Sequence, residues 1–217
     1  MVASAHRQCS GVGGGLSIVT AVRCRSRDLL VVAVSGGAVA AGARASRDDA
    51  IGDAESRIFA RVNSVTDRVV VPVWAVMQVG SLGGSLAIGA AVAASGHLRL
   101  GRRMAVVSAV TWMASKAVKP LVGRGRPVTV VDSARVLGRA STGLGYPSGH
   151  AAIAVAMASA ASPFVSRRLR PALWSVALGV GVSRIYVGAH MPLDVAGGVA
   201  LGVGTERAVR LLTGPAA

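Results

Sequence analysis

The sequence predicts an all-α protein: a six-transmembrane-helix bundle whose candidate site lies at the outer membrane–water interface. Apolar residues make up 52% of the 217 residues and charged residues only 15%, against roughly 25% charged in a typical soluble domain. The apolar residues gather in runs close to the length that crosses a bilayer. Arginines gather in alternate connections between those runs, as they do in membrane proteins of fixed orientation.

The composition also excludes other classes of protein. Disorder requires low hydrophobicity and high charge, and two cysteines, Cys9 and Cys24, are too few for a disulfide scaffold. The formal charge of +15 would suggest a nucleic-acid partner in a soluble protein. Aromatic residues, which stack on bases, are only 3% of this chain. We therefore expect a lipid bilayer, and no nucleic acid, as its environment and partner.

Six segments could span a membrane, because a bilayer core of about 30 Å needs roughly 20 mostly apolar residues. In chain order they are residues 29–46, 69–95, 104–122, 148–166, 172–189 and 193–212. The second has no charge over its whole length, so it could tilt or overhang. Small-xxx-small spacing predicts close helix packing at Gly80 with Gly84 and at Gly198 with Gly202.

The segments outside the spans complete the expected organisation. Residues 1–28 are rich in Ser, Gly and Arg and are predicted to be a mobile cytoplasmic tail, which leaves 29–217 as the integral membrane domain. The connection 44–68 mixes five arginines with five acids, and its part from Ser56 to Arg68 could form an interfacial helix.

Four arginine clusters set the expected orientation. They precede the first span, join the second to the third and the fourth to the fifth, and follow the sixth: Arg7, Arg23, Arg25 and Arg27; Arg99, Arg102 and Arg103; Arg167, Arg168 and Arg170; Arg207 and Arg210. Short arginine-rich loops stay cytoplasmic. Both termini are therefore expected inside a multi-pass plasma-membrane protein, and the other three connections outside.

The first outer motif, residues 119–127, runs from Lys119 to Arg126-Pro127. Cations at the edge of a membrane span are costly and usually functional. Lys119 offers a point charge and Arg126 a planar fork of donors, a pair suited to phosphate oxygens. Taken alone, the motif is equally compatible with snorkelling to lipid headgroups. Arg124, Arg135 and Arg139 lie in the same long loop. They are predicted to form a solvated basic face, and the alternative is contact with a second phosphate or the lipid headgroup.

The second motif, Pro147-Ser148-Gly149-His150, lies at the expected start of a helix. Ser148 could cap that helix, and free amides at a helix N-terminus favour an anion. Gly149 lets the backbone approach a ligand closely. An imidazole at His150 could deliver a proton near neutral pH, although a single histidine at a helix start is more often structural.

The third motif, residues 183–194, contains Arg184, His190 and Asp194. Pro192 suits the first position of a helix, which puts Asp194 in its first turn. A carboxylate there can accept from one imidazole nitrogen and orient the other, as for a nucleophile. The plain alternative is a capping aspartate beside an interfacial histidine.

Together the three motifs are more specific than any one of them, because all fall on the expected outer side. Their spacings, Lys-x6-Arg-Pro, Pro-Ser-Gly-His and Ser-Arg-x5-His-x3-Asp, resemble the tripartite signature of the type-2 phosphatidic acid phosphatase family, which is related to the vanadium haloperoxidases. The resemblance covers roughly residues 58–212. It implies a six-helix lipid phosphatase that needs neither a metal nor another cofactor.

The resemblance also implies the residue roles. His190 would attack phosphorus with Asp194 holding its tautomer, and His150 would protonate the leaving oxygen. Lys119, Arg126, Ser148, Gly149 and Arg184 would bind the phosphate oxygens. The substrate could be a polyprenyl pyrophosphate or a phosphatidic-acid-like lipid. A phosphotransferase would carry the same residues. A non-catalytic phospholipid or anion transporter would need the cations but not His150, His190 and Asp194.

Overall fold

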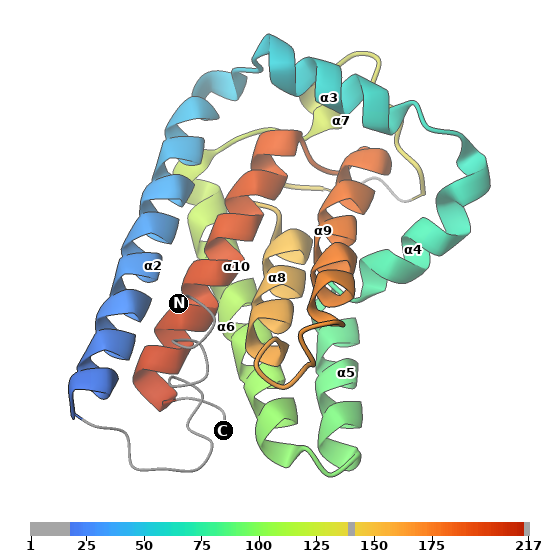
Figure 1. Ribbon diagram of the computed structural model, residues 1–217. Helices are drawn as coiled ribbons and strands as arrows, with labels where there is room; N and C mark the ends of the chain where they lie inside the picture. Colours follow the sequence, from blue (N-terminus) through green and yellow to red (C-terminus); the bar gives the residue numbers. More distant parts are fainter. Residues whose placement is uncertain (1–17, 139–141, 215–217) are drawn as a thin grey trace.

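The computed structural model describes residues 18–138 and 142–214, and every regular element in those residues is a helix. The helices are α2 (Ile18–Ala45), α3 (Asp53–Asn63), α4 (Val70–Gln78), α5 (Leu82–Ala94), α6 (Leu98–Val122), α7 (Pro127–Val130), α8 (Gly149–Ala161), α9 (Arg170–Tyr186) and α10 (Pro192–Thr213), with short 3-10 turns at Arg47–Asp49 and Asp67–Val69. The all-α prediction is confirmed. Figure 1 shows the long helices running between two ends of the molecule.

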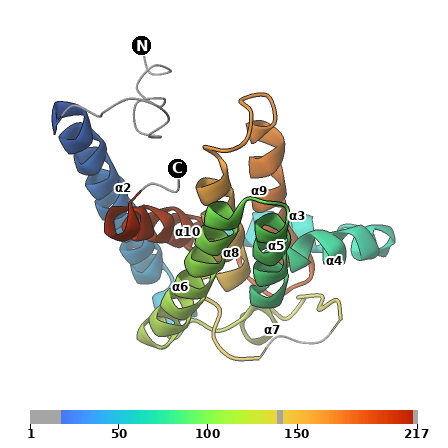
Figure 2. The same ribbon diagram turned by 90° about the horizontal axis from the view of Figure 1, so that it is seen from below.

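Helix α8 forms the centre of the bundle. Every residue from Ala151 to Ala161 is buried, and α8 packs against α5, α6, α9 and α10. Figure 2 shows it between its neighbours when the bundle is viewed end-on. The predicted packing glycines explain part of this proximity. A Cβ at Gly198 would collide with the Ser148 carbonyl oxygen and one at Gly202 with that of Ala152, so α10 lies directly on the backbone of α8.

The predicted span 69–95 is wrong as one continuous helix. The chain breaks at residues 79–81 into α4 and α5, which are bent by 61°. Ser81 caps α5 by accepting from the Gly84 N–H at 3.0 Å. Gly80 lies in the break, where a Cβ would strike the His150 carbonyl oxygen. The Gly80–Gly84 spacing therefore reflects this break and the approach to α8, and does not form one helix-packing stripe.

Other boundaries also differ from the predictions. Helix α2 begins at Ile18, so residues 18–28 are helical and not part of a tail, while residues 1–17 lie outside the described residues. Helix α6 begins at Leu98 and includes Arg99, Arg102 and Arg103. Helix α8 ends at Ala161, short of residue 166. At 13 residues it is about 20 Å long.

Helix α3 corresponds to the predicted interfacial helix, but it spans Asp53–Asn63 and not Ser56–Arg68. It crosses one end of the bundle above α9 and α10 (Figure 1). Phe59 packs against Ile185 and Met191. The buried Asn63 side chain donates to the carbonyls of Arg135 and Tyr186 at 2.9 and 2.8 Å. These contacts fix the loops before α8 and α10, and we call this the α3 end.

The opposite end, formed by the start of α2, the α5–α6 and α8–α9 turns and the end of α10, carries the four basic segments (Figure 1). We call it the arginine end. Its arginines are paired with acids: the buried Arg103 meets Glu206 at 2.9 Å, and the partly buried Arg210 pairs with Asp28. Arg207 lies 3.5 Å from Glu206. In the described residues these segments share one end of the molecule, as predicted, while Arg7 lies outside the described residues.

Length and composition alone support membrane crossing for part of the described chain. Residues Cys24–Ala45 of α2 are long and apolar enough to cross, and the bent pair Asp67–Gln78 with Leu82–Ala94 would form a second crossing if it is one broken span. The core helix α8 is apolar but shorter. Helices α6, α9 and α10 carry charged residues, several of them at the site described next.

Candidate active site

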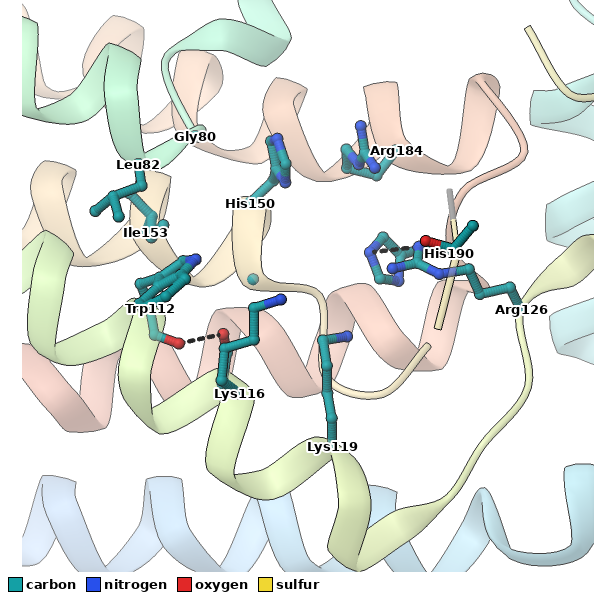
Figure 3. Close-up of a pocket in the computed structure, with 13 residues that line it drawn as sticks. Gly80, Leu82, Trp112, Lys116, Lys119, Arg126, His150, Ile153, Arg184 and His190 are labelled. Carbon is teal, nitrogen blue, oxygen red and sulfur yellow. Dashed lines mark hydrogen bonds between the residues drawn. The ribbon is translucent and has the colours of Figure 1, made fainter. Parts of the chain in front are cut away.

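A cavity of about 370 Å³ lies near the α3 end, where residues distant in the sequence meet. Six of the eight predicted site residues line it: Lys119, Arg126, Gly149, His150, Arg184 and His190. Figure 3 shows the side chains of five of them converging from α6, α8, α9 and the loops that follow α6 and α9: Lys119, Arg126, His150, Arg184 and His190. The two histidines, 40 residues apart in the chain, therefore share one cavity.

His190 is held by a carboxylate directly behind it. Its Nδ1 lies 3.3 Å from Asp194 Oδ2, while its Nε2 lies 3.5 Å from Arg126 Nη1 at the cavity. Pro192 begins α10 as predicted, and Asp194 Oδ2 also accepts from the Met191 N–H at 2.9 Å. Asp194 thus caps α10 and orients His190 at the same time, so both readings of the motif hold.

The surroundings keep His190 neutral. Burial lowers its pKa to about 3; Arg126 and Lys119 act in the same direction, and the nearby Asp194 opposes them. A neutral imidazole with Nδ1 facing a carboxylate carries its proton on Nδ1 and its lone pair on Nε2. The lone pair of a neutral His190 therefore lies on the nitrogen that faces the cavity.

The cations of the cavity are held in place by backbone carbonyls. Lys119 Nζ donates to the carbonyls of Leu144 and Gly145, both at 2.8 Å. Arg126 donates to Gly143 O at 3.2 Å and Ala189 O at 2.7 Å. Carbonyls fix these side chains without cancelling their charge, and burial lowers the pKa of Arg126. In the described chain no carboxylate lies within ion-pair distance of either group. The cavity is therefore suited to an anion.

Arg124 is a site residue that sequence reasoning missed. It was expected on a solvated face, but it is only 1% exposed. Its guanidinium contacts Asp194 Oδ1 at 3.0 Å and Glu55 Oε2 at 2.7 Å, and Glu55 also accepts from the Leu193 N–H. The two carboxylates raise the Arg124 pKa, while burial acts to lower it. Arg124 thus ties Asp194 to α3.

The other two loop arginines differ from Arg124. Arg135 is partly exposed and pairs with Asp67 at 3.2 Å, so the expectation of a solvated side chain holds better there. Arg139 lies outside the described residues. Two sequence features could have identified Arg124. It lies two residues before Arg126, just after α6, and the connection 44–68 is rich in acids that could pair with it.

The start of α8 agrees with the prediction only in part. Ser148 occupies the N-cap position, but its side chain makes no capping bond. Its hydroxyl is buried, has no hydrogen-bond partner among the described residues and does not line the cavity. Its N–H donates to the Asp194 carbonyl at 2.9 Å, which joins the second motif to the third. Gly149 and His150, the first two residues of α8, do line the cavity.

The described residues contain no group of three or more His, Cys, Asp or Glu side chains able to hold a metal ion. What the cavity gathers is cationic: Lys119, Arg126 and Arg184, with a neutral His190 beside them. Such a set of cations is suited to binding an anion.

Comparison with known proteins agrees with this arrangement. No curated protein sequence matches the chain. Among solved structures, the fold is similar to a transmembrane PAP2-type phosphatidylglycerolphosphate phosphatase from Bacillus subtilis, with a TM-score of 0.70 and 22% identity over 82% of this chain and 94% of that one. It is also similar to LpxE from Aquifex aeolicus, with a TM-score of 0.59 and 20% identity over 72% of this chain and 93% of that one.

The sequence profile of the PAP2 superfamily matches residues 85–214, a stretch that includes all three motifs. On this match over more than half of its length, the chain belongs to the PAP2 superfamily.

Proposed function

We propose that this protein is a lipid phosphatase that hydrolyses a lipid phosphate or pyrophosphate through a phosphohistidine on His190, without a metal ion. The observation that carries the proposal is the shared cavity: a neutral, carboxylate-backed His190 faces Lys119, Arg126 and Arg184 across about 370 Å³. The fold, which is similar to that of phosphatases acting on lipids, supports a phosphate ester attached to a lipid.

In the first step, His190 Nε2 attacks phosphorus and the bond from phosphorus to the leaving oxygen breaks. His150 gives its proton to that oxygen. The negative charge of the bound phosphate favours the protonated imidazole that this step requires. Lys119, Arg126 and Arg184 stabilise the equatorial oxygens, where charge resides in the transition state. Arg126 already lies beside the attacking nitrogen.

In the second step, water attacks the phosphohistidine. His150, now neutral, takes the proton of that water, and inorganic phosphate leaves as His190 Nε2 regains its lone pair. Asp194 holds the Nδ1 proton throughout and stabilises the charge that the ring carries in the intermediate. Arg124 holds Asp194 in turn.

The membrane arrangement belongs to the same proposal. The protein crosses the plasma membrane six times, with α4 and α5 forming one broken crossing, the arginine end cytoplasmic and the α3 end outside. Asp132 near the α3 end and Ser166 in the α8–α9 turn are both exposed. In a variant lacking the native cysteines, Asp132→Cys should react with an impermeant thiol reagent from outside and Ser166→Cys only after permeabilisation. The reverse pattern would overturn the orientation.

Activity is tested by phosphate release from a panel of lipid phosphates in detergent and excess EDTA. The wild type should release inorganic phosphate, and His190→Ala should lose about a thousandfold or more, as expected for a covalent nucleophile. Near-full activity in His190→Ala would reject the mechanism. Loss of lipid phosphate without inorganic phosphate would indicate transfer to an acceptor, which is the phosphotransferase alternative.

A further inference from the structure

The cavity has a second part that the phosphate-binding residues do not explain. Away from His190, its wall is formed by Leu82, Trp112 and Ile153, and Lys116 lies among them. Figure 3 shows Trp112 and Lys116 on the side of the cavity opposite His190. A cation in this otherwise apolar part of the wall has no role in the chemistry described so far.

Lys116 continues the line of cations on α6. It precedes Lys119 by three residues, which is about 4.5 Å along a helix, and Trp112 lies one turn earlier on the same face. The Lys116 ammonium is 5.7 Å from the centre of the Trp112 ring, and in the described chain no carboxylate pairs with it. Two like charges one turn apart destabilise a helix. Lys116 is therefore an exposed cation at the cavity with no ionic partner in the described chain.

The direction of the reaction indicates what would meet this cation. In phosphoryl transfer the attacking atom and the leaving oxygen lie roughly in line on opposite sides of phosphorus. With His190 attacking and His150 protonating the leaving oxygen, the leaving group extends away from His190. It extends toward the wall that contains Leu82, Trp112 and Lys116.

We propose that Lys116 determines specificity by binding a second phosphate that stays on the lipid, so that the preferred substrate is a lipid diphosphate. The inference rests on the proposed function. His190 takes the terminal phosphoryl group, the bridging P–O–P bond breaks, and its oxygen leaves on the lipid monophosphate. Lys116 binds the charge on that leaving group, and Trp112 and Leu82 contact the start of the chain.

A lipid monophosphate would make no use of Lys116. Its leaving group is an uncharged alcohol, and Lys119, Arg126 and Arg184 already surround the single phosphate. Replacing Lys116 therefore removes a charged hydrogen bond only from a substrate whose second phosphate accepts one. The residue therefore separates two substrates that differ by one phosphate.

The test compares initial rates on farnesyl diphosphate and farnesyl monophosphate, which share one chain, for the full-length protein in detergent. Lys116→Gln should lower kcat/KM for the diphosphate by about tenfold to a hundredfold, the effect of losing one charged hydrogen bond. It should change kcat/KM for the monophosphate by less than about threefold on the same grounds. Lys116→Arg should keep the preference for the diphosphate.

Arg102→Gln is the matched control, because Arg102 is an exposed cation at the far end of the same helix, and it should alter neither rate. An equal loss on both substrates, or none on either, would overturn the role of Lys116 while leaving the phosphatase intact. Failure of the wild type to release phosphate from either substrate, or from any of the lipid panel, would instead reject the proposed function. The two failures are therefore distinct.

Discussion

The two ends of the molecule hold their cations with different kinds of partner. At the arginine end, Arg103 and Arg210 meet carboxylates on Glu206 and Asp28. At the α3 end, Lys119 and Arg126 donate to backbone carbonyls and have no carboxylate partner in the described chain. A carboxylate neutralises a cation, whereas a carbonyl positions it and leaves its charge available. The type of partner therefore distinguishes cations neutralised by a carboxylate, which stabilise the bundle, from cations whose charge remains available to bind an anion.

Arg124 shows that the distinction depends on partners and not on place. It lies two residues from Arg126, yet Glu55 and Asp194 neutralise it as Glu206 neutralises Arg103. By this criterion Arg124 does not bind phosphate and acts through Asp194. The predictions below change one cation of each kind.

The largest expected effect is on the activity of a binding cation. Arg126→Gln should lower kcat/KM by about a hundredfold or more, the usual loss when one donor to a transition-state oxyanion is removed. Its thermal stability in detergent should stay near that of the wild type, because no buried carboxylate loses its partner. A variant that melts much earlier, with normal turnover per folded molecule, would contradict the comparison.

The same substitution at the arginine end should do the opposite. Arg103→Gln leaves Glu206, which is 2% exposed, without its closest cation, and breaking a buried pair costs about 3–5 kcal/mol. Turnover per folded molecule should be unchanged, as measured by phosphate release after correction for the folded fraction. A selective loss of turnover would show that the two ends are coupled.

Arg124 should give an intermediate result that identifies a positioning residue. Arg124→Met frees Asp194 from α3 and should lower kcat by about tenfold to a hundredfold through misalignment of His190, with KM little changed. It also leaves the buried Asp194 and the partly buried Glu55 without their shared cation, and should lower the melting temperature.

A second variant separates the two effects of Arg124. Combining Arg124→Met with Glu55→Gln removes one carboxylate as well, and should recover much of the stability but not kcat. Recovery of both quantities together would mean that Arg124 has only a structural role.

The last prediction concerns the pH dependence of stability. His190 has a pKa of about 3 in the fold and 6.5 ordinarily, so from pH 6.5 to 3 the unfolded chain binds a proton that the folded protein does not. Stability contributed by the neutral ring is complete above pH 6.5 and is lost as the pH falls toward 3. The free energy of unfolding should fall more steeply across this range in the wild type than in His190→Gln. Parallel curves would contradict the burial of a neutral His190.

The sequence was informative where the chemistry lies in short motifs. Lys119, Arg126, His150 and His190 could be placed together because each lies at the same end of its predicted span. The break at residues 79–81 was not predicted although Gly80 and Ser81 lie there, because glycine and serine are also common inside membrane-spanning helices. That bend depends on the contact between Gly80 and the backbone of α8.

Arg124 was missed for a related reason. An arginine in a glycine-containing loop is usually solvated. Arg124 is buried because it contacts residues far away in sequence, among them Glu55 on α3, 69 residues earlier. Long-range pairing of this kind decides burial and cannot be read from local pattern. Ser148 likewise occupies the expected N-cap position, but its hydroxyl makes no capping bond, and its N–H donates to the Asp194 carbonyl.

The most direct test of the account is to identify the atom that first captures phosphorus. Wild-type protein mixed with a lipid phosphate labelled with ³²P at its terminal phosphate and quenched in alkali should yield an acid-labile, alkali-stable phosphoprotein, with the label on the peptide that contains His190. His190→Ala should carry none. Label on another residue, or undiminished label in His190→Ala, would show that the cavity does not work by covalent capture at His190.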